Sequence, residues 1–315
     1  MDDDVVFHPA GLDAKLRGAV ADLQAGRWMS TRELLARTGA DWPLRTARSQ
    51  VLASAAARSD VLDHWACEDP GSTDLAVLRA RVAVLRALAA ERSRHRQAGP
   101  MHGKARDACW HATRIAPDDP VPWVAMLELA VLDPRQALQE HGGDPPDVML
   151  LDGPWWLLSQ LQRRDPYSRE GHHRMLRWWL SQGRSGFGHE FVSWLLNHAP
   201  AGSPLQLLPL YLHVERYRNG PRFSQWVEDR CARDAERAWE QWFLGRASEE
   251  RSVVDLSHLA HALWAGNRKV QAARVFDVLG PFGSPQPWES VAASGDGHAL
   301  LVDARRQAAR AAART

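Results

Sequence analysis

The sequence predicts an all-α protein, and three observations support that fold class. Residues 105–130 have the pattern of a helix, a proline-containing turn and a second helix, and residues 256–279 have the pattern of a helix, a Gly266-Asn267 turn and a second helix. Breaks at Asp69-Pro70, Ala116-Pro117 and Asp165-Pro166 each follow one predicted helix and precede another, at separations of 47 and 49 residues. A helix–turn–helix unit that recurs along a chain is typical of helical repeat proteins.

The first hairpin illustrates how the residues specify its helices. Small and apolar residues at spacings of three and four form one helical face, namely Ala105, Ala108, Cys109, Ala112 and Ile115. Proline lacks the N–H that a helix interior needs, so Pro117 and Pro120 separate the two helices, and an aspartate between them can cap the second. Residues 121–132 are apolar almost all round, so we expect that helix to be buried on more than one side.

The other helices follow from the same periodicity and from turn residues. Before the first hairpin we expect helices at 11–23, 30–37, 44–58, 61–67 and 75–93, the last capped by Ser72 or Thr73. After it, an irregular connection at 139–153 precedes helices at 155–164, 169–179, 190–197, 204–217 and 223–244, then the second hairpin and an alanine- and arginine-rich segment at 299–315. The predicted domains are a helical-repeat domain over 1–298 and a C-terminal capping helix or tail over 299–315.

Both hairpins resemble tetratricopeptide repeats. In the first, Ala105, Ala112, Pro117 and Trp123 match the two small residues, the helix-ending proline and the tryptophan that opens the next repeat. In the second, Ala272 and Phe276 are similar to the alanine and aromatic residue of a second repeat helix. The unequal spacing of the breaks indicates degenerate repeats with insertions. The resemblance implies a right-handed α-solenoid of antiparallel helix pairs, with a concave groove that binds a partner peptide.

The resemblance also implies which residues line the groove. Residues at equal distances from Pro70, Pro117 and Pro166 are expected at equivalent places on successive inner helices. In the tetratricopeptide family such positions tend to line the concave surface. Here they form a mixed-charge set that could pair with charged groups of a partner: Asp74, Arg81, Glu128, Glu170, His173 and Arg177. The alternative is that insertions rotate these side chains outward as ordinary surface charges.

Composition argues against several classes of protein. The 39 Lys and Arg residues against 38 Asp and Glu residues give a formal net charge of +1, so no global charge favours nucleic acid or an anionic membrane. No apolar run reaches the roughly 18 residues of a membrane-spanning helix, and the acidic start MDDDVVFHPAG lacks the apolar core of a secretory signal. Three widely separated cysteines favour reduced thiols over a disulfide framework. We therefore expect a cytoplasmic protein that does not contact membranes.

The densest local positive charge lies in residues 92–106, which we predict to be a loop between helices. Its basic residues are Arg92, Arg94, Arg96, Lys104 and Arg106. A solvated connection is the simplest explanation, and docking of an acidic peptide, a phosphate or nucleic acid is the functional alternative.

Histidine and tryptophan are abundant, at 14 and 15 residues, and were considered as ligand-binding groups. His258 and His261 are three residues apart, as metal ligands on a helix can be, but no further metal motif accompanies them. We therefore expect no metal and no other cofactor. The glycine-rich turn at 183–188 matches neither a nucleophile turn nor a dinucleotide-binding motif. The tryptophans are expected to form a core where helices cross, with a ligand cavity as the alternative.

The leading functional hypothesis is a non-catalytic adaptor that presents a helical groove to a protein or peptide, and no residue is assigned a catalytic role. Two alternatives are a nucleic-acid-associated regulator that uses residues 92–106 and a structural subunit of a larger assembly. A third is an enzyme or cofactor-binding protein with a cavity in residues 155–217, lined by Trp155, Trp156, His172, His173, Trp178, Trp179, His189, Trp194 and His213. The oligomeric state is left open.

Overall fold

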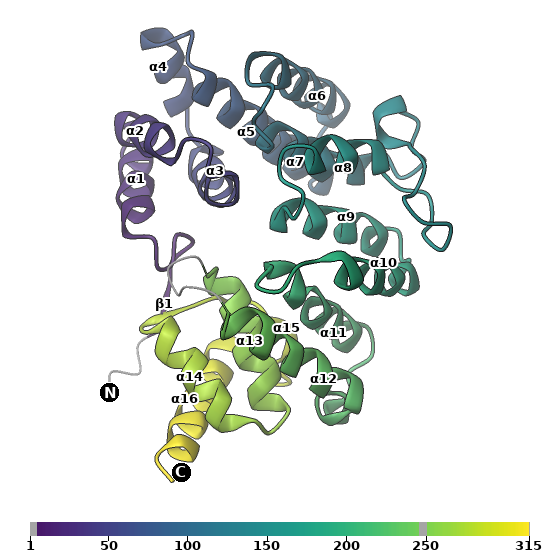
Figure 1. Cartoon of the computed structure of the whole chain (residues 1–315). Coiled ribbons are helices and arrows are strands. Elements are labelled where there is room, and N and C mark those ends of the chain that lie inside the picture. The colour runs from purple at the N-terminus through teal and green to yellow at the C-terminus, as the bar shows by residue number, and fades with distance from the viewer. Residues whose placement is uncertain (1–4, 246–250, 315) are drawn as a thin grey trace. The chain divides into compact units, whose positions relative to one another are not determined.

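The computed structural model describes residues 5–245 and 251–314 (Figure 1). The chain is 69% helical, with sixteen α-helices in these residues. The strands found there are the two-residue segments β1 (Val6–Phe7) and β2 (Phe282–Gly283), which pair in parallel. The prediction of an all-α protein is confirmed. The first four residues of the acidic start and the last residue of the predicted 299–315 segment lie outside the described residues.

The chain forms two compact units. One unit is Ala14–Phe191, and the other combines Met1–Asp13 with Val192–Thr315. They are called the 14–191 unit and the C-terminal unit. The division falls within helix α10 (Ser185–His198).

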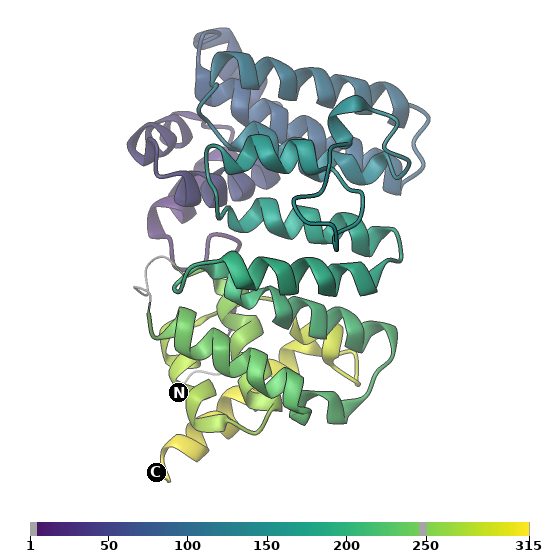
Figure 2. The ribbon, with the colours of Figure 1, turned by 45° about the vertical axis from the view of Figure 1, so that its right-hand side comes forward.

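Helices of the 14–191 unit contact one another in a regular order. They are α1 (Ala14–Gln24), α2 (Met29–Thr38), α3 (Trp42–Ala56), α4 (Val61–Glu68), α5 (Thr73–Arg92), α6 (Ala98–Ile115), α7 (Val121–Leu129), α8 (Trp155–Gln162) and α9 (Arg169–Ser181), with short 3-10 helices η1 (Ala130–Leu132) and η2 (Gln139–His141) after α7. Helix α1 contacts α3, α3 contacts α5, α5 contacts α7 and α7 contacts α9, while α2, α6 and α8 pack beside α1, α5 and α7. Figure 2 shows several of these helices lying side by side. Helix α3 also contacts α7 and α9, so helices that are not successive members of this series pack against one another as well.

Polar caps and prolines set the helix boundaries where the sequence predicts them. The side chain of Ser72 accepts a hydrogen bond from Leu75 N at 3.3 Å at the start of α5, which confirms the predicted cap. The three predicted proline breaks lie between α4 and α5, between α6 and α7, and between α8 and α9. Local turn chemistry therefore accounts for the alternation of helices and turns in this unit.

The prediction that residues 92–106 form a loop is wrong for most of the segment. Helix α5 ends at Arg92 and α6 begins at Ala98, so only residues 93–97 connect them. Pro100 lies in the first turn of α6, where its missing N–H has no helical partner to lose, and proline is tolerated there. The basic residues consequently divide among the end of α5, a short turn and the exposed side of α6.

Helices of the C-terminal unit follow α10 and surround a second core. They are η3 (Pro204–Leu207), α11 (Leu208–Asn219), η4 (Phe223–Val227), α12 (Asp229–Arg237), the π-helix η5 (Ala238–Phe243), α13 (Val253–Ala265), α14 (Lys269–Leu279), α15 (Trp288–Val291) and α16 (Gly297–Ala312). The predicted second hairpin is confirmed as α13 and α14, joined by a turn in which Asn267 has a positive φ of 61°. Leu301, Ala304 and Ala308 of α16 are fully buried, and this helix packs on α14. The terminal segment is therefore a packed helix as far as Ala312.

Two stretches predicted as single helices are divided in the structure. The stretch at 204–217 begins as the 3-10 helix η3, and Pro209 lies in the first turn of α11 instead of kinking a longer helix. The stretch at 223–244 consists of η4, α12 and η5 in succession. Apolar spacing alone does not distinguish these helical forms, because they place similar residues inward.

Tryptophans contribute much of both cores, as predicted from composition. Trp65, Trp178 and Trp179 in the 14–191 unit and Trp242 and Trp288 in the C-terminal unit are among the largest fully buried side chains. Large indole rings fill the space where helices cross and bury much apolar area per residue. None of the helices within residues 5–245 and 251–314 is both long and apolar enough to cross a membrane.

Candidate functional site

The most distinctive feature of the 14–191 unit is an ion pair buried between α5 and α9. Arg81 Nη1 lies 3.0 Å from Glu170 Oε1, and Arg81 Nη2 lies 2.5 Å from Glu170 Oε2, so the contact is bidentate. The two side chains are 3% and 5% exposed. Arg81 Nη2 also donates to the backbone carbonyl of Thr46 on α3 at 3.4 Å. One guanidinium group thus connects three helices.

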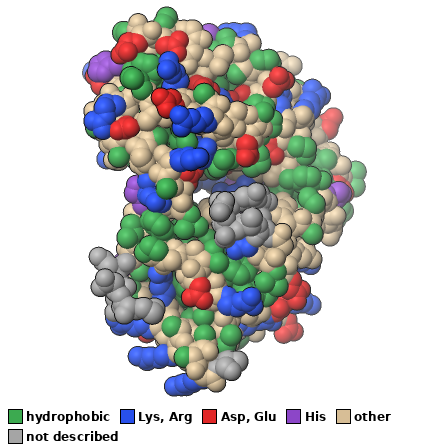
Figure 3. Space-filling model, turned by 60° about the vertical axis from the view of Figure 1, so that its left-hand side comes forward, with side chains coloured by type: hydrophobic (Ala, Val, Ile, Leu, Met, Phe, Trp, Pro, Cys, Tyr) green, Lys and Arg blue, Asp and Glu red, His purple; other side chains and the backbone are tan. Residues whose placement is uncertain are grey.

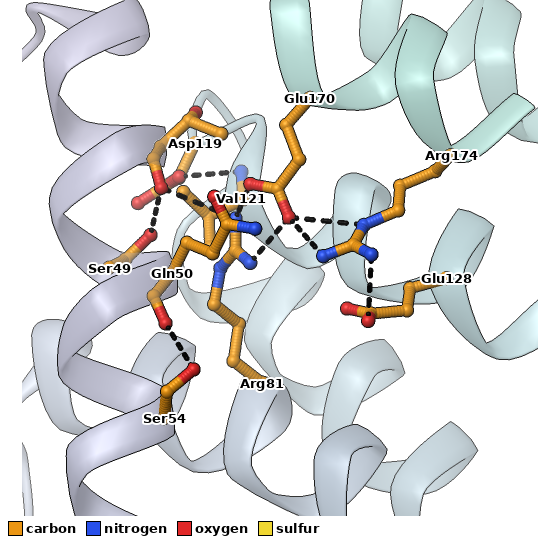
Figure 4. A network of polar contacts seen from close by, with 10 residues as sticks. Ser49, Gln50, Ser54, Arg81, Asp119, Val121, Glu128, Glu170 and Arg174 are labelled. Atoms are coloured by element: carbon orange, nitrogen blue, oxygen red, sulfur yellow. Dashed lines mark hydrogen bonds and ion pairs between the residues drawn. The ribbon is translucent and has the colours of Figure 1, made fainter. Parts of the chain in front are cut away.

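A second arginine extends the pair toward α7. Arg174, one turn after Glu170 on α9, donates from Nη2 to Glu170 Oε1 at 2.8 Å and forms an ion pair from Nη1 to Glu128 Oε1 at 3.0 Å. Figure 4 shows the Glu170 carboxylate between the guanidinium groups of Arg81 and Arg174. Glu170 therefore receives two positive charges, whereas Glu128 receives one direct ion pair.

Because their partners differ, the pKa values of Glu170 and Glu128 shift in opposite directions. Burial raises the pKa of Glu170, but attraction to Arg81 and then to Arg174 outweighs it and lowers that pKa to about 2. For Glu128, burial raises the pKa and dominates over attraction to Arg174, and the neighbouring Glu170 charge raises the pKa further. Glu170 is consequently ionised throughout the neutral range, and Glu128 takes up a proton more readily than Glu170 does.

A third arginine, Arg45, forms ion pairs with two aspartates of the same unit. Arg45 on α3 forms two ion pairs at 2.6 Å, from Nη2 to Asp74 Oδ1 in the first turn of α5 and from Nε to Asp119 Oδ2 just before α7. The other oxygen of Asp119 accepts a hydrogen bond at 2.8 Å from Val121 N, the first residue of α7, whose N–H has no partner within the helix. Arg45 therefore fixes the start of α5 and the start of α7 to α3.

We call these seven residues the ion-pair network: Arg45, Asp74, Arg81, Asp119, Glu128, Glu170 and Arg174. Charges buried this deeply lose hydration, and this cost is offset only when each group keeps its partners. Removing one member leaves an uncompensated charge in the interior, so the network opposes sliding of α3, α5, α7 and α9 past one another. It is chemically suited to holding helices in register.

Four of the six residues predicted for the groove belong to this network. Asp74, Arg81, Glu128 and Glu170 come from three helices and form ion pairs inside the unit, Arg81 with Glu170, Asp74 with Arg45 and Glu128 with Arg174. The other two lie on α9, where His173 is half-buried and Arg177 is exposed. Arg177 also helps to lower the pKa of Glu128 through its charge. The structure thus satisfies the charges of Asp74, Arg81, Glu128 and Glu170 within the unit.

Three network members, Arg45, Asp119 and Arg174, were not identified from the sequence. Arg45 precedes the first of the superposed prolines, so equal offsets from those prolines could not reach it. Asp118 and Asp119 were predicted only as turn and helix-capping residues, with no arginine partner. Arg174 lies one turn from Glu170, a spacing that brings side chains onto the same helical face. That spacing was the one sequence signal that could have identified Arg174.

An open pocket of about 290 Å³ lies beside Arg45, at one end of the network. It is lined by the end of α2, the starts of α3 and α5 and the turn before α7: Leu35, Ala36, Gly39, Trp42, Arg45, Thr73, Asp74, Ala116, Pro117, Asp118 and Asp119. Its three carboxylates exceed its single guanidinium group, which already pairs with Asp74 and Asp119. The half-buried Trp42 adds an aromatic surface. Such a lining favours a cationic group carried on an apolar stem.

The tryptophan and histidine residues proposed as a cavity at 155–217 divide between the two units. Trp194 and His213 belong to the C-terminal unit, and the others belong to the 14–191 unit. There Trp155 and Trp179 pack against each other and against Phe191, with ring centroids 4.8 to 6.0 Å apart. These rings form part of the packed core.

Histidines and cysteines show no arrangement for metal chemistry in the part of the chain that the structure describes. No three His, Cys, Asp or Glu side chains come together there as metal ligands could. His258 Nδ1 lies 2.9 Å from the backbone carbonyl of Val254, and burial lowers the pKa of His261 to about 3. The three cysteines are free thiols, of which Cys67 is exposed.

The predicted basic residues are distributed rather than gathered. Arg92, Arg94, Arg96 and Lys104 are exposed, whereas Arg106 donates to the Glu140 carboxylate. On the face of the molecule drawn in Figure 3, basic and acidic side chains are interspersed. That face therefore lacks the continuous positive surface typical of nucleic-acid binding.

Comparisons with known proteins identify no relative: no family model, no curated protein and no solved structure matches the chain.

Proposed function

We propose that the protein is a non-catalytic cytoplasmic adaptor, a degenerate tetratricopeptide-like α-solenoid that binds a protein or peptide partner. The observation that carries this proposal is the stepwise packing of α1, α3, α5, α7 and α9, with α2, α6 and α8 alongside. Helical repeat proteins build extended binding surfaces from such neighbour-to-neighbour packing. The three cysteines are all free thiols, which agrees with a protein of a reducing compartment.

The ion-pair network supports a scaffold role in this proposal. Four residues implied by the family resemblance to contact a partner instead form ion pairs inside the unit: Arg81 with Glu170, Asp74 with Arg45 and Glu128 with Arg174. Their contribution is to fix helices in register. A surface held by fixed helices loses little conformational freedom when a partner binds, and this favours affinity. The groups that bind the partner must then be accessible ones at the edge of the ion-pair network.

The pocket beside Arg45 is an accessible site that fits one side chain of a partner. Its volume of about 290 Å³ is at the lower end of the roughly 300–1,000 Å³ typical of small-molecule sites, which suits one long side chain. Asp118 is exposed on its rim, and Trp42 supplies the surface on which a lysine or arginine stem can lie. We infer that a basic residue of the partner enters this pocket.

Charge reversal at the pocket rim tests the proposal. The tagged protein is isolated from its own host as wild type, as Asp118→Lys and as Asp107→Lys, and the co-purifying polypeptides are quantified by mass spectrometry. Asp107 is exposed on α6 and lies outside the pocket lining, so its reversal makes the same change in net charge. We expect a polypeptide at fixed stoichiometry with wild type and Asp107→Lys that is lost with Asp118→Lys.

Two results would count against the proposal. Equal recovery of the polypeptide with all three proteins would exclude the pocket as the binding site. Recovery of no polypeptide with any of them would reject the adaptor function itself.

A further inference from the structure

The most exposed large apolar side chains among the described residues lie next to each other. Val148 is 98% exposed and Met149 is 72% exposed, whereas the next in order, Val227, is 60% exposed. Both belong to the connection between η2 and α8, which projects from the helices of its unit in Figure 1. Adjacent apolar side chains this exposed are unusual on a protein surface that contacts only water.

The backbone places these two residues at the tip of a tight turn. Leu150 N donates to the backbone carbonyl of Asp147 at 3.0 Å, and Met149 N donates to the Asp147 side chain at 2.9 Å. Val148 and Met149 are therefore the two central residues of a four-residue turn. Glycine, proline, asparagine, aspartate and serine dominate such positions, so neither residue is there for turn formation.

Hydrogen bonds hold the base of the loop in one conformation. Trp155 Nε1 donates to the Leu151 carbonyl at 2.7 Å, Trp179 Nε1 donates to the Asp152 carbonyl at 3.4 Å, and Trp156 N donates to the Gly142 carbonyl at 2.9 Å.

Two further features fix the loop beside these hydrogen bonds. Leu150 is 5% exposed and so anchors the turn in the unit. Gly143 has a φ of +113°, and a Cβ there would lie 2.7 Å from Trp156 N. The exposed tip thus sits on an ordered base, and its binding to a partner would cost little ordering entropy.

The charge around the tip has one sign. Residues 142–153 contain Asp144, Asp147 and Asp152 and no lysine or arginine. Asp144 and Asp152 are exposed, and within the described residues no ion pair joins any of the three to a basic side chain. A convex apolar tip with an acidic border is complementary to an apolar cavity bordered by basic side chains.

We propose that the Asp147–Leu150 turn is a docking element that inserts Val148 and Met149 into an apolar cavity, bordered by lysine or arginine, on a protein partner. This inference builds on the proposed adaptor function and adds a second contact, separate from the pocket beside Arg45. The apolar side chains supply affinity through burial, and the three aspartates orient the turn on the partner and favour its approach.

The variant Val148→Ser/Met149→Asn tests the docking element. Serine and asparagine suit a turn, so the fold is retained, as circular dichroism and the urea midpoint will report. The matched control is Met29→Ser/Val227→Ser, which removes two other exposed apolar side chains. The partner is first captured by a photo-crosslinking amino acid placed at residue 149, then identified and purified.

Titration of the purified partner against each protein gives the decisive comparison. We expect the affinity to fall at least tenfold for the turn variant, to stay within twofold for the control, and to weaken for wild type as NaCl is raised. Absence of a crosslink from residue 149, or unchanged affinity of the turn variant, would overturn the docking element. If the docking element fails this test but Asp118→Lys abolishes binding of the partner, the adaptor function remains supported and only the docking element is rejected. If no partner binds the wild-type protein, both proposals fail.

Discussion

Arg81 and Glu170 stand 89 positions apart in the sequence yet share a two-hydrogen-bond contact in the interior of the 14–191 unit. Neither side chain has appreciable access to water. A contact of this kind depends on the relative placement of α5 and α9 and on every helix between them. The pair therefore reports whether the whole helix series is in register.

Replacing Glu170 with Gln is expected to destabilise the unit strongly. The change leaves the Arg81 and Arg174 guanidinium groups without their shared carboxylate, and breaking a buried pair in this way costs about 3–5 kcal/mol. Urea unfolding of the whole chain, with hydrogen exchange of the α5 and α9 amides, measures the loss. Arg37→Ala is the control, because its ion pair with Glu33 is exposed and is worth less than about 1 kcal/mol. Equal stability of the two variants would contradict the role given to the network.

Stability should fall as the pH is lowered from neutral. Burial lowers the pKa of His172 to about 4, below the ordinary value of 6.5, so between these values the unfolded chain binds more protons than the folded chain. Unfolding is therefore favoured as the pH falls through this window. The lowered pKa of Glu170 acts in the same direction, since its stabilisation is present above pH 4.5 and is lost toward pH 2.

The His172→Gln variant separates the histidine contribution from the rest. Gln does not titrate, so the uptake of protons on unfolding between pH 4 and 6.5 should decrease by about one per chain. The free energy of unfolding, measured at several pH values for both proteins, gives this number. An unchanged pH dependence would show that His172 is protonated in the folded protein.

Thiol reactivity should distinguish the three cysteines. Cys67 is exposed, whereas Cys109 and Cys231 are buried, and burial raises their pKa values to about 12 and about 11. Because the thiolate is the reactive form, a disulfide reagent near pH 8 should modify one thiol quickly and the other two only after denaturation. The fast phase should disappear in Cys67→Ser. A second fast thiol would mean that one of the cores opens readily.

Much of the helical arrangement was predictable because it depends on local chemistry. The breaks at Pro70, Pro117 and Pro166 and the cap at Ser72 act over a few residues, and all are found where the sequence places them. The misassigned loop at 92–106 shows the limit of that reasoning. Pro100 breaks a helix interior but is accepted in a first turn, and its position relative to the helix start cannot be read from the residue alone.

The candidate site was predictable only in part. Equal offsets from the prolines selected Arg81 and Glu128, which lie on the contacting helices α5 and α7 and close enough for the Arg81 charge to act on the Glu128 carboxyl. Whether those side chains face a groove or one another depends on how closely α3 approaches α9, which is a property of the whole unit. For the same reason Arg45, which pairs with residues 29 and 74 positions away, had no local signal.

Native mass spectrometry of the protein purified from its own host, with an absorbance spectrum of the same sample, distinguishes an adaptor from a protein that binds a metal or cofactor. The adaptor account predicts a polypeptide bound at fixed stoichiometry and an absorbance spectrum limited to the protein. A bound metal, chromophore or small molecule in place of a polypeptide would contradict that account and would direct attention to the tryptophan- and histidine-rich residues 155–217.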